Sequence, residues 1–478
     1  MFLILFMFST AFAFSYDLLK VIEDNIDKNV EACDNFYRHS CAKQNNSQTI
    51  KEYMDFGYSA DLEEIDQKFI SNSIQKSIVI AKNLEGSEEH FTKSYEIELK
   101  NLYIEKCERN NTEALKFLKT LQVFFNLQEN EDCKWSECFS NLAMDSNCTR
   151  AAQTLYEGII IKTGLDYYKL ESLTKTYQNV LSIIWHVQNH EKSAELRKMF
   201  EFFKTELLSQ IETTPWLINS KTVGIFKNIT SQLYLSEMEI DIKTVIEDWL
   251  QFQKNYENCT STYSELGQLA IDYCINKNLP EIREIEIFQN NAENRHPQIF
   301  IYNPLTAIMS KEEHLALKYG IFGANIGHKM GETIIVNNLE DGFFPYFSEN
   351  VKNCVQDQFN ETCRIYKESN CTVGDFDENG SDIFGISFGF DRLKQEMGEE
   401  IYNKIPGSKF GLTHAQAYFY AVSSWYCDRD DGANNDRVNS GVIQSPEFEN
   451  VFNCPKDSRM VQSRKQFCHV LGEDAPQN

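Results

Sequence analysis

Apolar residues recur at intervals of three and four over most of the first half of the chain. Two stretches show the pattern: Leu115, Leu118, Leu121, Phe124 and Phe125, and later Met199, Phe202, Phe203 and Leu207. Because this spacing puts apolar side chains on one face of a helix, we expect a mainly helical region from Ser15 to about Leu279. The aromatic residues on these faces are better explained as core than as a ligand-binding cluster.

The pattern changes between Ile285 and Ile301, where short runs rich in Ile, Phe and Tyr replace the helical spacing. Such runs are typical of strands and sheet edges. A chain of 478 residues with 42% hydrophobic residues suits two domains, and only nine prolines and 21 glycines favour long helices. We therefore predict a mainly α (α+β) fold, with one region over residues 14–280 and a second domain over residues 281–478.

Residues 1–13 have the features of a secretory signal peptide. Leu3 to Phe8 form a short apolar core, and Ala11-Phe12-Ala13 fits the small-x-small cleavage pattern, although no basic residue precedes the core. The alternative is a retained membrane anchor. Spanning a bilayer takes about 20 apolar residues, and neither this segment nor a later one is that long. We expect a secreted, extracellular protein with no transmembrane anchor after signal cleavage.

Cysteine content and potential glycosylation sites favour the same compartment. Fourteen cysteines, an even number, suit an oxidised disulfide framework outside the cytosol. Asn-x-Ser/Thr sequons begin at Asn45, Asn110, Asn147, Asn228, Asn258, Asn360, Asn370 and Asn379. The net charge of −25 argues against nucleic acid or an anionic membrane surface as a partner, since both would be repelled.

The run Gly327-His328-Lys329-Met330-Gly331-Glu332 has the outline of a zinc-peptidase helix. In His-Glu-x-x-His, two histidines four residues apart bind zinc, and the glutamate is the general base for the metal-bound water. Here His328 remains, Lys329 stands at the position of the base, and Glu332 stands at the position of the second histidine. Taken alone, a His with a Glu four residues later is a weak signal, because such pairs are common on helices.

Segments on both sides of this run, in matching order, resemble the neprilysin family of zinc endopeptidases. The segments that carry the resemblance are Cys33-Asp34-Asn35-Phe36-Tyr37-Arg38-His39-Ser40-Cys41, Asn291-Ala292 with Pro297-Gln298-Ile299-Phe300, Tyr319-Gly320, Glu378-Asn379-Gly380-Ser381-Asp382, Trp425-Tyr426-Cys427, Ser445-Pro446, and Cys454 with Cys468. They span nearly the whole chain. The resemblance implies a neprilysin-like zincin C-terminal domain joined to a helical lid domain.

The resemblance also implies roles for individual residues. Glu378 matches the third zinc ligand, Asp382 matches the aspartate that orients the first zinc histidine, and Asn291-Ala292 matches the segment that holds the substrate backbone. The next two residues, Glu293 and Asn294, stand where the family has aromatic residues. The implied disulfides are Cys33–Cys454, Cys41–Cys427, Cys354–Cys468 and Cys107–Cys148. Short-loop pairs are expected for the remaining cysteines: Cys133–Cys138, Cys259–Cys274 and Cys363–Cys371.

The lid domain is expected to be reduced. Family members carry a long helical insertion between the cysteines that match Cys107 and Cys148, whereas these two are only 41 residues apart here. A shortened lid would leave the cleft more open to solvent or to a protein partner.

Two further departures concern catalysis. Lys329 offers no base to a metal-bound water, and its positive charge opposes a divalent ion, so this exchange alone is expected to abolish the family mechanism. Gln444 stands where the resemblance places a transition-state-stabilising histidine, and the arginine expected shortly afterwards has no match before Cys454.

The retained acidic residues also have structural explanations. Asp382 is expected to contact His328 as a buried structural pair, and an ion pair between Glu378 and Lys329 is a possible replacement for metal charge. Asn379 lies inside a family helix and is expected to carry no glycan.

The leading hypothesis is a secreted pseudopeptidase that acts by binding peptides or extracellular proteins, with no cofactor. The alternative is weak zinc-dependent endopeptidase activity through His328, Glu332 and Glu378, with zinc as the cofactor if a metal site persists. A third hypothesis is a duplicate without function. The sequence names neither a partner nor an oligomeric state.

Overall fold

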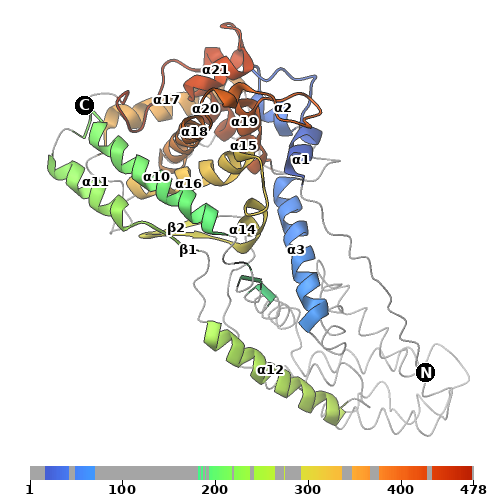
Figure 1. The fold of residues 1–478 in the computed structure, drawn as a ribbon. Coiled ribbons are helices and arrows are strands. Elements are labelled where there is room, and N and C mark those ends of the chain that lie inside the picture. Colours follow the sequence, from blue (N-terminus) through green and yellow to red (C-terminus); the bar gives the residue numbers. More distant parts are fainter. Residues whose placement is uncertain are drawn as a thin grey trace, which may run out of the picture. The chain divides into compact units, whose positions relative to one another are not determined.

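A computed structural model gives the fold, which is mainly α as predicted (Figure 1). It describes residues 17–41, 49–69, 181–182, 185–186, 189, 193–217, 220–236, 242–263, 274, 292–335, 347–366, 376–427 and 433–475. The predicted signal peptide, the apolar stretch from Leu115 to Phe125 and the Cys107–Cys148 and Cys133–Cys138 pairs lie outside these residues. No helix among the described residues is long and apolar enough to cross a membrane.

The chain divides into two compact units. The first combines Met1–Asp61, Gln188–Glu239 and Ile287–Asn478, so it draws on both regions predicted from the sequence. The second combines Leu62–Val187 and Ile240–Glu286. Its longest described element is helix α12 (Ile242–Tyr263), and the predicted disulfide Cys259–Cys274 is present there.

Helices form most of the first unit. Its elements before the sheet are α1 (Leu18–Asn25), α2 (Phe36–Cys41), the start of α3 (Ile50–Phe69), α10 (Ala194–Thr213) and α11 (Ser220–Gln232). After the sheet come α14 (Asn303–Met309), α15 (Leu315–Lys318), the π-helical turn η3 (Tyr319–Gly323), α16 (Ala324–Ile335), α17 (Glu349–Tyr366), α18 (Phe376–Met397), the 3-10 turn η4 (Gly398–Tyr402), α19 (His414–Trp425), α20 (Ala433–Ile443), α21 (Pro446–Phe452) and α22 (Arg459–Ser463).

Helix α10 carries the apolar stripe from Met199 to Leu207 that was predicted from the sequence. Met199, Phe203 and Leu207 of the apolar stripe are buried, and Phe202 is partly buried against the same core. The ring of Phe203 meets Phe388 of α18 edge-on, with centroids 5.2 Å apart. The prediction that these aromatic residues belong to the core is therefore confirmed for this stripe.

Three short strands form a small sheet in the order β1-β3-β2, comprising β1 (Tyr234–Ser236), β3 (Gln298–Ile301) and β2 (Ala292–Arg295). β1 runs parallel to β3, and β2 runs antiparallel to it, with Ala292 opposite Ile301. β3 is buried along its whole length, which suits its apolar sequence. The prediction of strands before Ile301 is thus confirmed for residues 292–301.

Disulfides tie the N-terminal helices to the C-terminal part of the first unit. Cys33, just before α2, is bonded to Cys454, and Cys41, the last residue of α2, is bonded to Cys427. Each partner lies about 400 residues further along the chain, as the resemblance implies, and Cys354–Cys468 is also present. The buried ring of Phe36 packs among aromatic rings of α19 and α21 beside these bonds. Cys363 is disulfide-bonded, and its predicted partner Cys371 lies outside the described residues.

Helices α16 and α18 cross at very short range because glycines lie at the contact. A Cβ atom on Gly385 of α18 would lie 2.5 Å from the backbone nitrogen of His328 and 2.6 Å from the carbonyl oxygen of Ala324. A Cβ on Gly327 of α16 would in turn lie 3.0 Å from the Cα of Gly385. The obstacle at Gly385 is backbone, which cannot move aside as a side chain can.

Replacing Gly385 with Ala is expected to lower the free energy of unfolding by about 2 kcal/mol or more, because the added methyl group forces the two helices apart. Gly224 on α11 is the matched control, since a Cβ there meets nothing within 4 Å. Gly224→Ala is expected to raise the free energy by up to about 1 kcal/mol through helix propensity. Urea unfolding followed by circular dichroism measures both, and equal effects at the two positions would contradict the crossing geometry.

Candidate functional site

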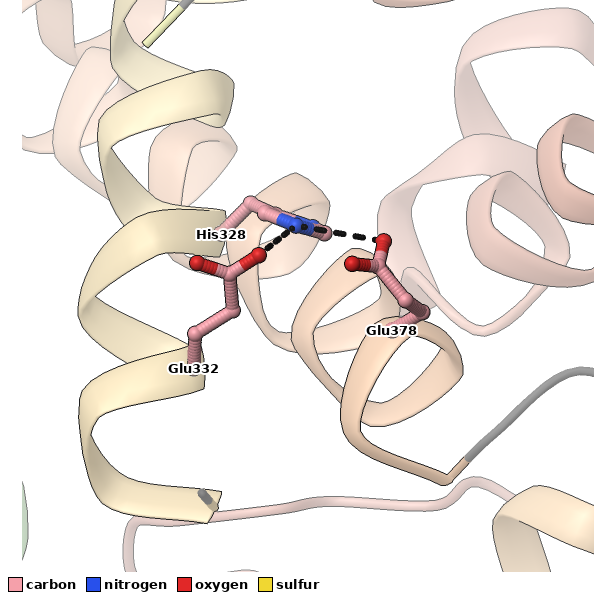
Figure 2. Close-up of side chains that lie close together, drawn as sticks. All are labelled: His328, Glu332 and Glu378. Atoms are coloured by element: carbon pink, nitrogen blue, oxygen red, sulfur yellow. Dashed lines mark hydrogen bonds and ion pairs between the residues drawn. The ribbon is translucent and has the colours of Figure 1, made fainter. Parts of the chain in front are cut away.

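Two neighbouring helices present the residues that the sequence analysis singled out. His328 and Glu332 lie four residues apart on one face of α16, and Glu378 and Asp382 lie four residues apart on α18. Figure 2 shows the ring of His328 lying between the carboxylates of Glu332 and Glu378. The close helix crossing brings these four side chains together.

His328 is buried among three carboxylates. Its Nε2 atom lies 2.9 Å from Oε1 of Glu332 and 3.6 Å from Oε2 of Glu378, while Nδ1 lies 2.8 Å from Oδ1 of Asp382. The last contact is a close ion pair in which the N–H does not point well at the oxygen. Burial alone would lower the pKa of His328, but Asp382 and Glu332 outweigh burial and raise it to about 9.

Lys329 forms an ion pair with Glu332. Its Nζ atom donates to Oε1 of Glu332 at 2.6 Å, and both side chains are largely buried. The interpretation that Lys329 pairs with Glu378 is wrong, because the lysine lies one turn from Glu332 on its own helix and reaches that carboxylate first. Burial would raise the pKa of Glu332, but His328 and Lys329 together lower it.

Arg437 of α20 is the cation on the other side of the site. Its Nη2 atom donates to Oε2 of Glu378 at 2.9 Å, and its Nε and Nη2 atoms donate to the two oxygens of Asp382 at 2.7 and 2.9 Å. The hydroxyl group of Tyr426 donates to Asp382 at 2.8 Å, and the guanidinium carbon of Arg437 lies 5.1 Å from the Tyr426 ring centroid. Burial would raise the pKa of Asp382, but Arg437 and His328 hold it well below its usual range.

Arg437 is a site residue that was not predicted from the sequence. An arginine was sought after Gln444, whereas the arginine that reaches the site lies seven residues before it. The sequence did offer a signal for such a residue. Asp382 was expected to be buried, and a buried carboxylate needs more than one positively charged or donating partner.

The side chain of Gln444 bonds to α17 and to the C-terminal segment. Its Nε2 atom donates to Oε1 of Gln358 at 2.6 Å and to the carbonyl of Gln466 at 3.0 Å, and its Oε1 atom accepts from the backbone of Cys468 at 2.6 Å. These bonds join α17 to the C-terminal segment and use the whole amide. Gln444, expected as a degenerate position in place of the family's transition-state-stabilising histidine, thus makes structural hydrogen bonds between α17 and the C-terminal segment.

Strand β2 borders the site from the sheet side. Ala292 is fully buried, Asn291 lies outside the described residues, and Nδ2 of Asn294 donates to Oγ1 of Thr333 on α16 at 3.0 Å. Glu293 accepts from Tyr302 and Arg295. Burial would raise the pKa of Glu293, but these two bonds and the charge of Lys329 lower it. The rim that the resemblance makes aromatic is thus polar and hydrogen-bonded here.

One group of side chains in the described part of the chain has the arrangement of a metal site. One ligand atom each of His328, Glu332 and Glu378 lie within 4.8 Å of one another. The fit to zinc is nevertheless poor. The facing oxygens of Glu332 and Glu378 already contact the cationic side chains of Lys329 and Arg437, with which an ion would have to compete.

A search of family models matches residues 307–468 to the family described as Peptidase family M13. A comparison with curated proteins finds no significant match. Among solved structures, a Haemonchus galactose-containing glycoprotein complex matches with a TM-score of 0.53 at 13% identity, covering 96% of this chain and 100% of that chain. The inhibitor complex of the Mycobacterium tuberculosis zinc metalloprotease Zmp1 matches with a TM-score of 0.49 at 10% identity, covering 94% and 99%.

The pKa of His328 is expected to be about 9 in the folded protein, against about 6.5 for a free imidazole. Because the folded value is the higher one, the stabilisation from these contacts is complete below about pH 6.5 and is lost as the pH rises through about 9. A titration of the histidine signals by two-dimensional NMR measures this value, with His328→Gln to assign the signal. A midpoint near 6.5 would contradict the ion-pair geometry.

Proposed function

The chain belongs to peptidase family M13, whose model matches residues 307–468. We propose that it is a neprilysin-like pseudopeptidase that acts by binding peptides or extracellular proteins. The observation that carries the proposal is Lys329 at the position of the general base, with its ammonium group 2.6 Å from Glu332. Hydrolysis on this fold takes zinc ligands, an open coordination position and a base for the metal-bound water. An ammonium group held by a neighbouring carboxylate supplies none of these.

A binding role uses parts of the fold that are kept. Strand β2 lies at one edge of the three-stranded sheet that the structure describes, and the proposed binding mode adds an extended peptide along this strand through backbone hydrogen bonds. Glu293 and Asn294, which replace aromatic residues of the family pattern, would then favour a ligand with polar side chains over an apolar one. The Asn291-Ala292 segment is the proposed contact for the ligand backbone.

The second candidate function is weak zinc-dependent endopeptidase activity. It is favoured by the convergence of His328, Glu332 and Glu378, whose ligand atoms lie within 4.8 Å of one another. One imidazole with two carboxylates is a harder and less zinc-selective set than the usual one. The lack of a base at residue 329 counts against turnover even if zinc binds.

Secretion is part of the proposal. Disulfides such as Cys33–Cys454 suit an oxidising compartment, and Asn360 on α17 is exposed and open to glycosylation. Asn379 is only 2% exposed inside α18, so its sequon is expected to stay unmodified. Mass spectrometry of protein recovered from the medium of expressing cells checks this. A glycan at Asn379, or protein retained wholly inside the cell, would contradict it.

The functional test compares binding with cleavage. The purified wild-type protein is incubated with a library of labelled peptides. Binding without hydrolysis is expected, and activity is expected to lie at least about 100-fold below that of a Lys329→Glu, Glu332→His variant that regains the base and the second histidine. Fluorescence anisotropy measures binding, and mass spectrometry detects products.

Two outcomes would decide against the proposal. Wild-type hydrolysis that a zinc chelator abolishes would establish the second candidate function. Neither binding nor cleavage, in a protein that circular dichroism shows to be folded, would contradict the binding role.

A further inference from the structure

The two carboxylate oxygens that face the imidazole of His328 each have a second, positively charged partner. Oε1 of Glu332 lies 2.9 Å from Nε2 of His328 and 2.6 Å from Nζ of Lys329. Oε2 of Glu378 lies 3.6 Å from the same Nε2 and 2.9 Å from Nη2 of Arg437. A metal bound by His328, Glu332 and Glu378 would have to share these oxygens with the two cations.

The two cations together carry the charge of one divalent ion. Buried carboxylates need such compensation, and Asp382 and Glu332 have side chains that are only 1% and 13% exposed. Lys329 provides it for Glu332 and Arg437 provides it for Asp382, so each of these two buried carboxylates has a positively charged side chain of the protein as a partner.

We infer that Lys329 stands in for a divalent ion as the positive charge beside Glu332 at the crossing of α16 and α18, that Arg437 compensates Asp382, and that Lys329 is the group that excludes such an ion. The inference concerns the site of the proposed function and rests on its loss of catalysis. Lys329 then has two effects. It removes the general base, and it supplies the charge that lets the site fold without a metal ion.

Lys329 is the decisive cation for a geometric reason. A zinc ion on Oε1 of Glu332 would lie about 2 Å from it, and an ammonium group 2.6 Å from the same oxygen would repel the ion at short range. Arg437 directs two of its hydrogen bonds at Asp382 and one at Glu378. The side chain of Glu378 is 47% exposed, so it can turn toward an ion while Arg437 keeps Asp382.

Removing the ammonium group should therefore uncover a site for a divalent cation. The ligands would be one imidazole and two carboxylates, whose donor atoms already lie within 4.8 Å of one another, so small side-chain movements bring them to bonding distance. Zinc and manganese are the ions that suit this set.

The test measures the melting temperature of the full chain with and without zinc. The wild type is expected to be unchanged by a chelator or by about 0.1 mM zinc, whereas Lys329→Gln and Lys329→Met are each expected to gain roughly 3 °C or more with zinc. Lys352→Gln on α17 is the matched control, because Lys352 also pairs with a glutamate three residues away, Glu349, at 2.9 Å. This variant and Lys329→Arg are expected to remain unresponsive.

A Lys329→Gln, Glu332→Gln variant separates the uncovered site from adventitious binding, since it is expected to lose the response. The inference is overturned if the wild type is stabilised by zinc or destabilised by the chelator, a measurement that does not depend on any variant folding. It is also overturned if a folded Lys329→Gln or Lys329→Met protein shows no response. Neither result depends on peptide binding, so the proposed function can stand or fall separately.

Discussion

The closeness of helices α16 and α18 is the constraint on which the site depends. With hydrogen atoms in place of side chains at Gly327 and Gly385, the two backbones approach so nearly that a methyl group at Gly385 would overlap the backbone of His328. This approach puts His328 within ion-pair distance of residues on both helices. The fold itself matches a solved structure with a TM-score of 0.53 at 13% identity.

Much of the fold could be predicted because it follows from local patterns. The three- and four-residue spacing around Phe203 identified a helix and its buried face, and the short runs rich in Ile, Phe and Tyr before Ile301 identified strands. The assembly of the first unit from three separate stretches could not be predicted from such patterns, because it depends on long-range packing. Cysteine positions supplied long-range information through the family resemblance, and Cys33–Cys454 is an example.

The site was predictable where the family resemblance assigns a position to a residue, and less so where a partner is chosen by the reach and direction of side chains. His328, Glu332, Glu378 and Asp382 come together as the family resemblance implies. The partner of Lys329 was mistaken because the choice between two carboxylates depends on side-chain reach. Arg437 was missed for the same reason. Arg437 on α20 bonds Asp382 of α18, whereas Gln444, just after α20, bonds Gln358 of α17. Lys329 contacts Glu332 and Arg437 contacts Glu378, so a metal ion at these two carboxylates would compete with a cationic side chain at each.

The disulfide between Cys33 and Cys454 also sets an order of events during synthesis. The two cysteines are 421 residues apart, so at 5–20 residues per second the ribosome needs roughly 20–80 s between making the first and the second. During that interval the thiol of Cys33 has no native partner, although Cys41 and other cysteines are already present. The unit that contains the site therefore closes only after Cys454 has been made, and its early cysteines depend on an isomerase or on delayed oxidation to avoid wrong pairs.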